Sequence, residues 1–126
     1  AHELFFSDGM LGTPGGDAQD QWTLQFFLNM VVFGMNLQEA IDAPSVHTNH
    51  FINSFYPKNA GDGTVIVEDG IPAETLRQLQ ALGHRLHLSP AHAHGEVCAV
   101  AHDPATGLVE GAASSKGSGQ AYAVGW

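Results

Sequence analysis

Gly12-Thr13-Pro14-Gly15-Gly16-Asp17 leads directly into an apolar pattern that predicts a helix over about residues 18–33. Two adjacent glycines let the backbone approach a ligand closely, and Pro14 restricts how the chain enters the turn. The free N–H groups at the start of a helix point outward, where they can hold an oxyanion. The same residues also fit an ordinary turn before a helix, and Asp17 would repel an anion in the same cavity. The stretch therefore predicts a turn followed by a helix, and it does not decide whether the turn binds an oxyanion.

The size and charge of the chain exclude some classes of function. A chain of 126 residues is long enough for one domain with a real core. Its four basic residues are scattered among thirteen acids, which give a formal net charge of −9. Nucleic acid is excluded as an expected partner because phosphate binding needs clustered Lys and Arg. No apolar run approaches the ~20 residues that cross a bilayer, so no membrane span is expected.

Charged residues make up 13% of the chain, about half the usual ~25%, which predicts that part of the surface lies against another chain or domain. The sequence does not begin with Met and reaches the glycine stretch almost at once, so we expect it to be part of a longer protein. The single cysteine, Cys98, excludes an intrachain disulfide and is expected to be a buried strand residue. Nothing indicates a compartment.

Three helices are expected. The first helix is expected to have Asp17 as its N-cap and to bury one apolar stripe. A glycine is expected to end it. A capping-box pattern starts the second helix at Asn36 and a proline stops it after about Asp42. The third runs from Pro72 to about residue 82. The buried stripe of the first helix is Trp22, Phe26, Phe27, Met30 and Phe33, and Gly34 ends this helix.

Short strands are expected between and after the helices. Their ranges are 3–6, 45–51, 64–67, 84–88, 96–102, 109–114 and 122–124. Residues 103–107 predict the turn of a hairpin, and residues 53–63 predict a loop. The pattern indicates an α+β protein with helices packed on a mixed or antiparallel sheet.

Other site motifs are absent or weak. Neither the P-loop nor the dinucleotide-binding pattern is present, so no cofactor is expected. A Ser/His/Asp triad could include Ser114 or Ser115, but no nucleophile-elbow motif supports it. Five histidines lie close together, and two of them, His92 and His94, would share one face if their segment were a strand. The full group is His84, His87, His92, His94 and His102. Zinc sites usually need defined pairs with cysteine or carboxylate help, so no metal site is assigned.

The run from Gly12 to Thr48, GTPGGDAQDQWTLQFFLNMVVFGMNLQEAIDAPSVHT, resembles the C-terminal subunit of the γ-glutamyltransferase (γ-glutamyltranspeptidase) family. Members carry a Gly-Ser/Thr-Pro-Gly-Gly loop, a long helix, Phe/Tyr-Gly-Met/Leu-Asn and Glu-Ala-x-x-Ala-Pro. The later segments at 65–68, 71–76 and 122–125 fit as well, so the resemblance covers nearly the whole chain. The stretch after the glycine loop is similar to a sub-branch in which some members hydrolyse other amides.

The resemblance implies a four-layer αββα sandwich and an autoprocessing N-terminal nucleophile hydrolase, whose new N-terminal Thr attacks an amide. Its acyl group, γ-glutamyl in the best-known members, passes to water or to an amine. The family's two oxyanion-hole glycines correspond to Gly15 and Gly16, and Thr13 and Asp17 are predicted to contact the substrate. The family's nucleophile lies upstream of the loop, so residues 1–126 would be the C-terminal portion of the small subunit and inactive alone. The expected partners are the large subunit, the rest of the small subunit and a small-molecule amide.

Two other functions stay open from the sequence. A non-catalytic binding or interaction domain could keep the fold without the nucleophile. A histidine-based metal protein would retain stoichiometric zinc or nickel after dialysis.

Overall fold

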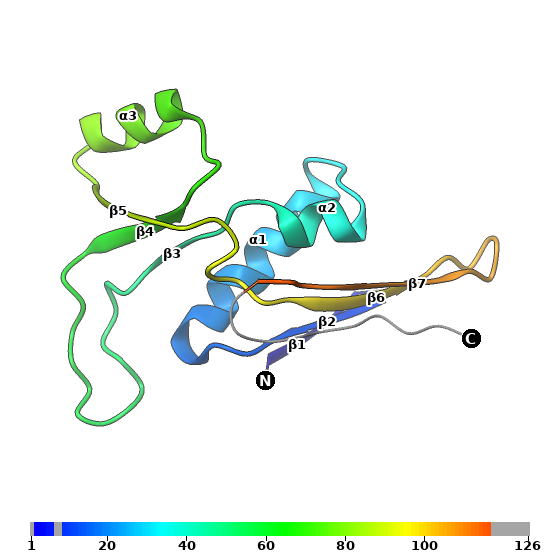
Figure 1. The fold of residues 1–126 in the computed structure, drawn as a ribbon. Helices are drawn as coiled ribbons and strands as arrows, with labels where there is room; N and C mark the ends of the chain where they lie inside the picture. The colour runs from blue at the N-terminus through cyan, green and yellow to red at the C-terminus, as the bar shows by residue number, and fades with distance from the viewer. Residues whose placement is uncertain (1, 7–8, 117–126) are drawn as a thin grey trace.

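A computed structural model describes residues 2–6 and 9–116 of the chain (Figure 1). The elements along the chain are β1 (His2–Phe6), β2 (Gly9–Thr13), the 3-10 turn η1 (Gly16–Ala18), α1 (Gln19–Val31), α2 (Leu37–Asp42), β3 (Val46–Thr48), β4 (Thr64–Glu68), α3 (Ala73–Ala81), β5 (Arg85–Ser89), β6 (Cys98–His102) and β7 (Val109–Ala113). The α+β prediction is confirmed. The described strands form two sheets, whereas the strand pattern alone suggested a single mixed or antiparallel sheet and the family resemblance implied a sandwich with two.

The larger sheet is antiparallel in the order β1-β2-β6-β7, and α1 and α2 cover one of its faces (Figure 1). The hairpin predicted at residues 103–107 joins β6 to β7, with the Gly107 N–H donating to the Asp103 carbonyl at 2.7 Å. The core between helices and sheet is apolar, because each strand turns alternate side chains toward the helices. Its buried members are Leu11, Phe26, Leu37, Ala40, Ile41, Val97, Ala99 and Ala112.

The smaller sheet has the order β3-β4-β5, with β3 antiparallel and β5 parallel to β4. Its parallel pair is joined through α3, which lies over this sheet and has no buried residue (Figure 1). Parallel neighbours require such a crossover connection. Leu82, at the end of this helix, is 77% exposed in the described chain.

Several local expectations hold and others need correction. The capping box is present: the Asn36 side chain accepts from the Glu39 N–H, and the Glu39 carboxylate accepts from the Asn36 N–H, both at 2.9 Å. The prediction that Asp17 caps the first helix is wrong, since α1 starts at Gln19 after the 3-10 turn that contains Asp17. The predicted burial of Phe33 is also wrong: α1 ends two residues earlier and Phe33 is 69% exposed.

Strand boundaries also differ from expectation. Gly12 and Thr13, expected in the loop, belong to β2. The strand expected over 45–51 is reduced to β3, and the strand expected at 122–124 lies outside the described residues. Cys98 is in a strand as expected but is exposed, because its neighbour Ala99 occupies the core-facing position.

Candidate active site

The glycine turn is held firmly where it leaves β2. Thr13 is 2% exposed, and its hydroxyl donates to the carbonyl of Glu96, which precedes β6. The Thr13 carbonyl in turn accepts from the Gln19 side-chain amide at 2.7 Å. These two bonds tie the entry of the turn to the neighbouring segment and to the first turn of α1.

Both glycines of the turn have backbones that disfavour any other residue. Gly15 has φ +131° and Gly16 has φ +58°. A Cβ on Gly15 would lie 2.1 Å from Cζ3 of Trp22, and one on Gly16 would lie 3.0 Å from Cε2 of Phe55. Side chains are therefore excluded by conformation and by space.

The N–H groups of Gly15 and Gly16 are available donors. The hydrogen bond that closes the turn uses the carbonyl of Gly15, which accepts from the Ala18 N–H at 3.3 Å. Both glycines are exposed, and no acceptor within residues 2–6 and 9–116 takes a hydrogen bond from either N–H. Two adjacent, free N–H groups at the start of a helix can stabilise a developing negative charge.

Asp17 faces a cleft beside this turn. Its carboxylate accepts from the Ser54 N–H at 2.7 Å, and these hydrogen bonds to Ser54 hold the pKa of Asp17 below its ordinary value. The cleft has a volume of about 260 Å³, and its lining mixes polar and apolar residues. Its lining residues are Asp17, Gln21, Thr48, Asn49, Phe51, Ile52, Asn53, Asn59, Ala60 and Gly61. An anionic Asp17 makes this cleft suited to neutral or cationic polar groups rather than to anions.

Trp22, whose ring lies against Gly15, forms an aromatic cluster with two histidine rings. The His94 ring stacks on the Trp22 ring at 6.5 Å and 17°, and His47 meets it edge-on at 5.3 Å. His47 is 8% exposed, and its pKa is lowered by burial and by the neighbouring His94, against an opposing effect of Glu68. Within the described part of the chain, Trp22 Nε1 and His47 Nδ1 have no hydrogen-bond partner. These three rings are called the Trp22 platform below.

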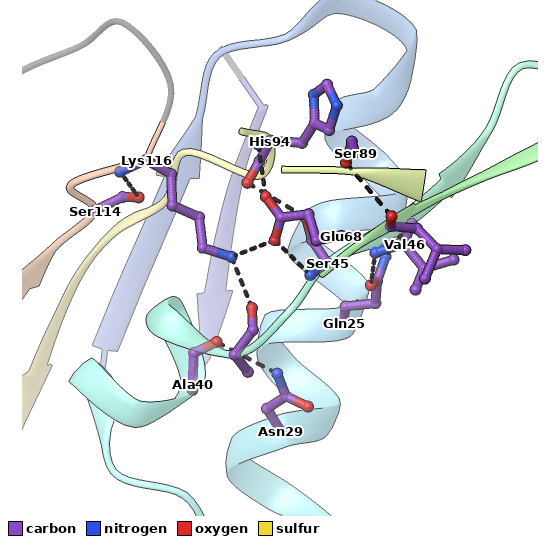
Figure 2. Close-up of polar contacts among 12 residues, drawn as sticks. Gln25, Asn29, Ala40, Ser45, Val46, Glu68, Ser89, His94, Ser114 and Lys116 are labelled. Carbon is purple, nitrogen blue, oxygen red and sulfur yellow. Dashed lines mark hydrogen bonds and ion pairs between the residues drawn. The ribbon is translucent and has the colours of Figure 1, made fainter. Parts of the chain in front are cut away.

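A buried ion pair links Glu68, the last residue of β4, to Lys116 in the segment that follows β7 (Figure 2). Lys116 Nζ lies 3.1 Å from Glu68 Oε2, and each side chain is 1% exposed. Glu68 also accepts from the Ser45 N–H at 2.8 Å and the His94 N–H at 2.7 Å, while Lys116 Nζ donates to the Ala43 carbonyl at 2.7 Å. Burial alone would raise the pKa of Glu68, but these backbone hydrogen bonds and Lys116 outweigh it and hold the pKa below its ordinary value.

Sequence reasoning identified the glycine turn but missed this ion pair and the Trp22 platform. Glu68 and Lys116 are 48 positions apart, and no periodicity links them. The available signal was the scarcity of basic residues, because a chain with only four of them has few partners for a buried acid.

The other candidate residues are distributed differently from the sequence expectation. His92 and His94 do not share a strand face, because residues 90–97 form turns and irregular backbone. Among the residues that the structure describes, no three His, Cys, Asp or Glu side chains are grouped so that they could hold a metal ion. Ser114 is buried, and its hydroxyl oxygen accepts from the Lys116 N–H at 2.9 Å. None of the helices in the described ranges is long and apolar enough to cross a membrane.

Known proteins with similar sequences and structures indicate the class of protein to which this fold belongs. A solved structure of a variant of LmbA2991 has a TM-score of 0.86 and 44% identity, and covers 94% of this chain and 21% of the other. A glutathione hydrolase proenzyme of Bacillus subtilis (strain 168) is 30% identical over 114 residues, and the acylase ACY 1 proenzyme of Pseudomonas sp. (strain V22) is 32% identical over 114 residues. Each match covers 90% of this chain, which spans 17% and 18% of the two relatives. The fold is that of the glutathione hydrolase and acylase type of N-terminal nucleophile hydrolases.

The family model described as gamma-glutamyltranspeptidase matches residues 7–124. The chain belongs to the γ-glutamyltranspeptidase family. The resemblance inferred from the glycine loop is thereby confirmed, and the homologues are hydrolases and acylases made as proenzymes.

Proposed function

We propose that the complete protein is an N-terminal nucleophile amidohydrolase or acyltransferase and that residues 1–126, the C-terminal portion of its small subunit, supply the oxyanion hole. The observation that carries this is the pair of exposed glycines, Gly15 and Gly16, whose N–H groups have no acceptor in the described chain. Family membership supports the reaction class.

In this reaction, the hydroxyl oxygen of a Thr upstream of this chain forms a bond to the amide carbonyl carbon. The carbonyl oxygen becomes an oxyanion, and the two glycine N–H groups donate to it. The Thr α-amine takes the hydroxyl proton during the attack and passes it to the leaving nitrogen when the C–N bond breaks, so the amine departs neutral and the acyl group remains on the Thr oxygen as an ester. Water or a second amine then attacks this ester through a similar oxyanion. Because the donors are fixed before the charge develops, each contributes about 2.7–4 kcal/mol to transition-state stabilisation in comparable sites.

The cleft beside Asp17 is proposed to hold the amine part of the substrate. The Asp17 carboxylate is charged at neutral pH, and its hydrogen bonds to Ser54 lower its pKa further, so the cleft favours an amine or amide over an acid. A substrate contact from Thr13 stays a prediction. Its buried hydroxyl, which donates to Glu96, supports an anchoring role for the turn.

The acyl donor is proposed to be a γ-glutamyl or related amide, since the named relatives include a glutathione hydrolase and an acylase. The proposed partners are the large subunit and the upstream part of the small subunit. In this arrangement residues 1–126 alone have no turnover, because the nucleophile is on another segment.

Replacement of Gly16 by Val in the complete protein tests the oxyanion assignment. Val at φ +58° next to Phe55 displaces the turn, so kcat should fall about 10²–10³-fold. The matched control is Gly34→Val, which has the same kind of strain at φ +68° with nothing within 4 Å. Undiminished turnover in Gly16→Val would contradict the assignment.

A panel of amide substrates tested on the complete wild-type protein separates the alternative function. A complete, folded wild-type protein that hydrolyses and transfers none of a panel of γ-glutamyl and other acyl amides would be a non-catalytic binding domain with this fold.

A further inference from the structure

We propose that Glu68 is a positioning residue for the glycine turn, acting through the segment His94–Glu96. This inference rests on the proposed function, because it assigns a catalytic consequence to the position of Gly15 and Gly16. Glu68 does not line the cleft at Asp17 and touches no proposed reacting atom. Its effect travels through contacts that the structure describes.

The first step is the anchorage of the segment. The Glu68 carboxylate accepts from the His94 N–H through Oε1 at 2.7 Å. Its other oxygen, Oε2, accepts from the Ser45 N–H at 2.8 Å and from Lys116 Nζ at 3.1 Å (Figure 2). The Ser45 hydroxyl also donates to the His94 carbonyl at 3.3 Å. Residue 94 is thus held on both sides of its backbone by one buried cluster.

The second step is the connection from this segment to the turn. The carbonyl of Glu96, two residues after His94, accepts from the hydroxyl of Thr13 at the entry of the turn. The His94 ring stacks on Trp22, and Trp22 lies so close to Gly15 that a Cβ there would be 2.1 Å from its ring. The segment therefore contacts the turn in two ways, through the hydrogen bond from Thr13 to Glu96 and through the packing of Trp22 against Gly15.

The third step is close packing, which makes the connection stiff. Gly95 has φ +75°, and a Cβ on it would lie 3.1 Å from Ser45 Oγ and 3.7 Å from Cδ1 of Trp22. The segment is therefore packed tightly against Ser45, while a side chain on Gly95 would be at ordinary van der Waals distance from the Trp22 ring. A shift at residue 94 is passed on to Trp22 and Thr13, because packed interiors resist local compression.

Glu68→Gln tests this with nearly the same shape. An amide has one acceptor oxygen, so either the His94 N–H or the Ser45 N–H and Lys116 must face an NH₂ group. Two donors at Oε2 favour placing the amide oxygen there, which leaves the His94 N–H without an acceptor. The segment is then released on the side that supports the turn.

The kinetic readout distinguishes positioning from a general loss of folded protein. In the complete protein, kcat per titrated active site for a γ-glutamyl anilide should fall about tenfold or more, with KM changed less than about twofold. The affinity for a small boronic acid, which forms a tetrahedral adduct like the transition state, should fall by the same factor as kcat.

Two controls define the baseline. Glu74→Gln makes the same change on an exposed acid of α3 and should leave kcat within about twofold. Leu37→Ala removes a buried side chain from α2 and should reduce stability while kcat per titrated site is retained. If Glu68→Gln behaves like Leu37→Ala, with kcat per site preserved, Glu68 is structural and the proposal is overturned.

Hydrogen exchange gives a readout independent of activity. Exchange of the peptide spanning residues 12–18 in the complete protein should be faster in Glu68→Gln than in wild type and in Glu74→Gln. Unchanged exchange would overturn the positioning role even if the enzyme assignment is correct. Faster exchange in a protein that turns over no amide would support the mechanical link and reject the proposed function.

Discussion

Gly15→Ala should be the most costly small substitution in the glycine turn, because conformation and space both oppose it. The backbone at φ +131° is rarely adopted by an L-residue and costs about 1–3 kcal/mol. The new Cβ would lie 2.1 Å from Trp22 Cζ3, and the ring has little freedom to move because His94 stacks on it and His47 meets its edge. Overpacking of this kind costs about 1–3 kcal/mol more. The expected loss of unfolding free energy is therefore about 2–6 kcal/mol.

The assay is denaturant unfolding of the complete protein, with Gly34→Ala as the matched control. Gly34 also has a positive φ, +68°, but a Cβ added there would meet nothing within 4 Å, so Ala should cost about 1–2 kcal/mol at this position. A double-mutant cycle with Trp22→Leu isolates the steric part, since a smaller side chain leaves room for the methyl group. The steric explanation fails if Gly15→Ala costs no more than Gly34→Ala, or if its cost is the same with Leu at position 22.

Two further predictions concern the core and the histidine pair. Phe26 is 2% exposed in the centre of the core, so Phe26→Ala should lower the unfolding free energy by about 3–5 kcal/mol, measured by denaturant unfolding; a loss below about 1 kcal/mol would contradict its burial. The lowered pKa of His47 means that folding favours its neutral form, so its contribution to stability is complete above about pH 6.5 and is lost as pH falls toward the lowered value. The variant His47→Asn should therefore show a smaller decrease in unfolding free energy than wild type between about pH 7 and 5, and equal decreases in both proteins would reject this role for His47.

Local sequence signals predicted the elements whose causes are local. The capping box at Asn36 and Glu39 gave the start of α2, and Gly34 marked the end of α1 with φ +68°. The hairpin between β6 and β7 followed from its turn residues. In each case the residues that determine the conformation lie within a few positions of one another.

Features that depend on distant partners were not predictable in this way. Asp17 is a good cap by type, but its carboxylate bonds to the Ser54 N–H, 37 positions away, and α1 begins without a side-chain cap. Division of the strands into two sheets depends on pairing between segments far apart in sequence. The Glu68–Lys116 pair is the same kind of case, because its two residues lie 48 positions apart in the sequence.

The candidate site was predicted in part. Its glycines were recognised from composition and from the family resemblance, and their positive φ values agree with the need for glycine. Trp22 was predicted only as a member of a buried helix stripe, since helical spacing does not reveal which ring lies against the turn.

The most direct test of the oxyanion assignment is a crystal structure of the complete protein with a boronic acid bound covalently to its nucleophile. We expect one oxygen of the tetrahedral adduct to lie about 2.7–3.1 Å from the backbone nitrogens of Gly15 and Gly16. An adduct whose oxygens are all out of hydrogen-bond reach of both nitrogens would contradict the assignment.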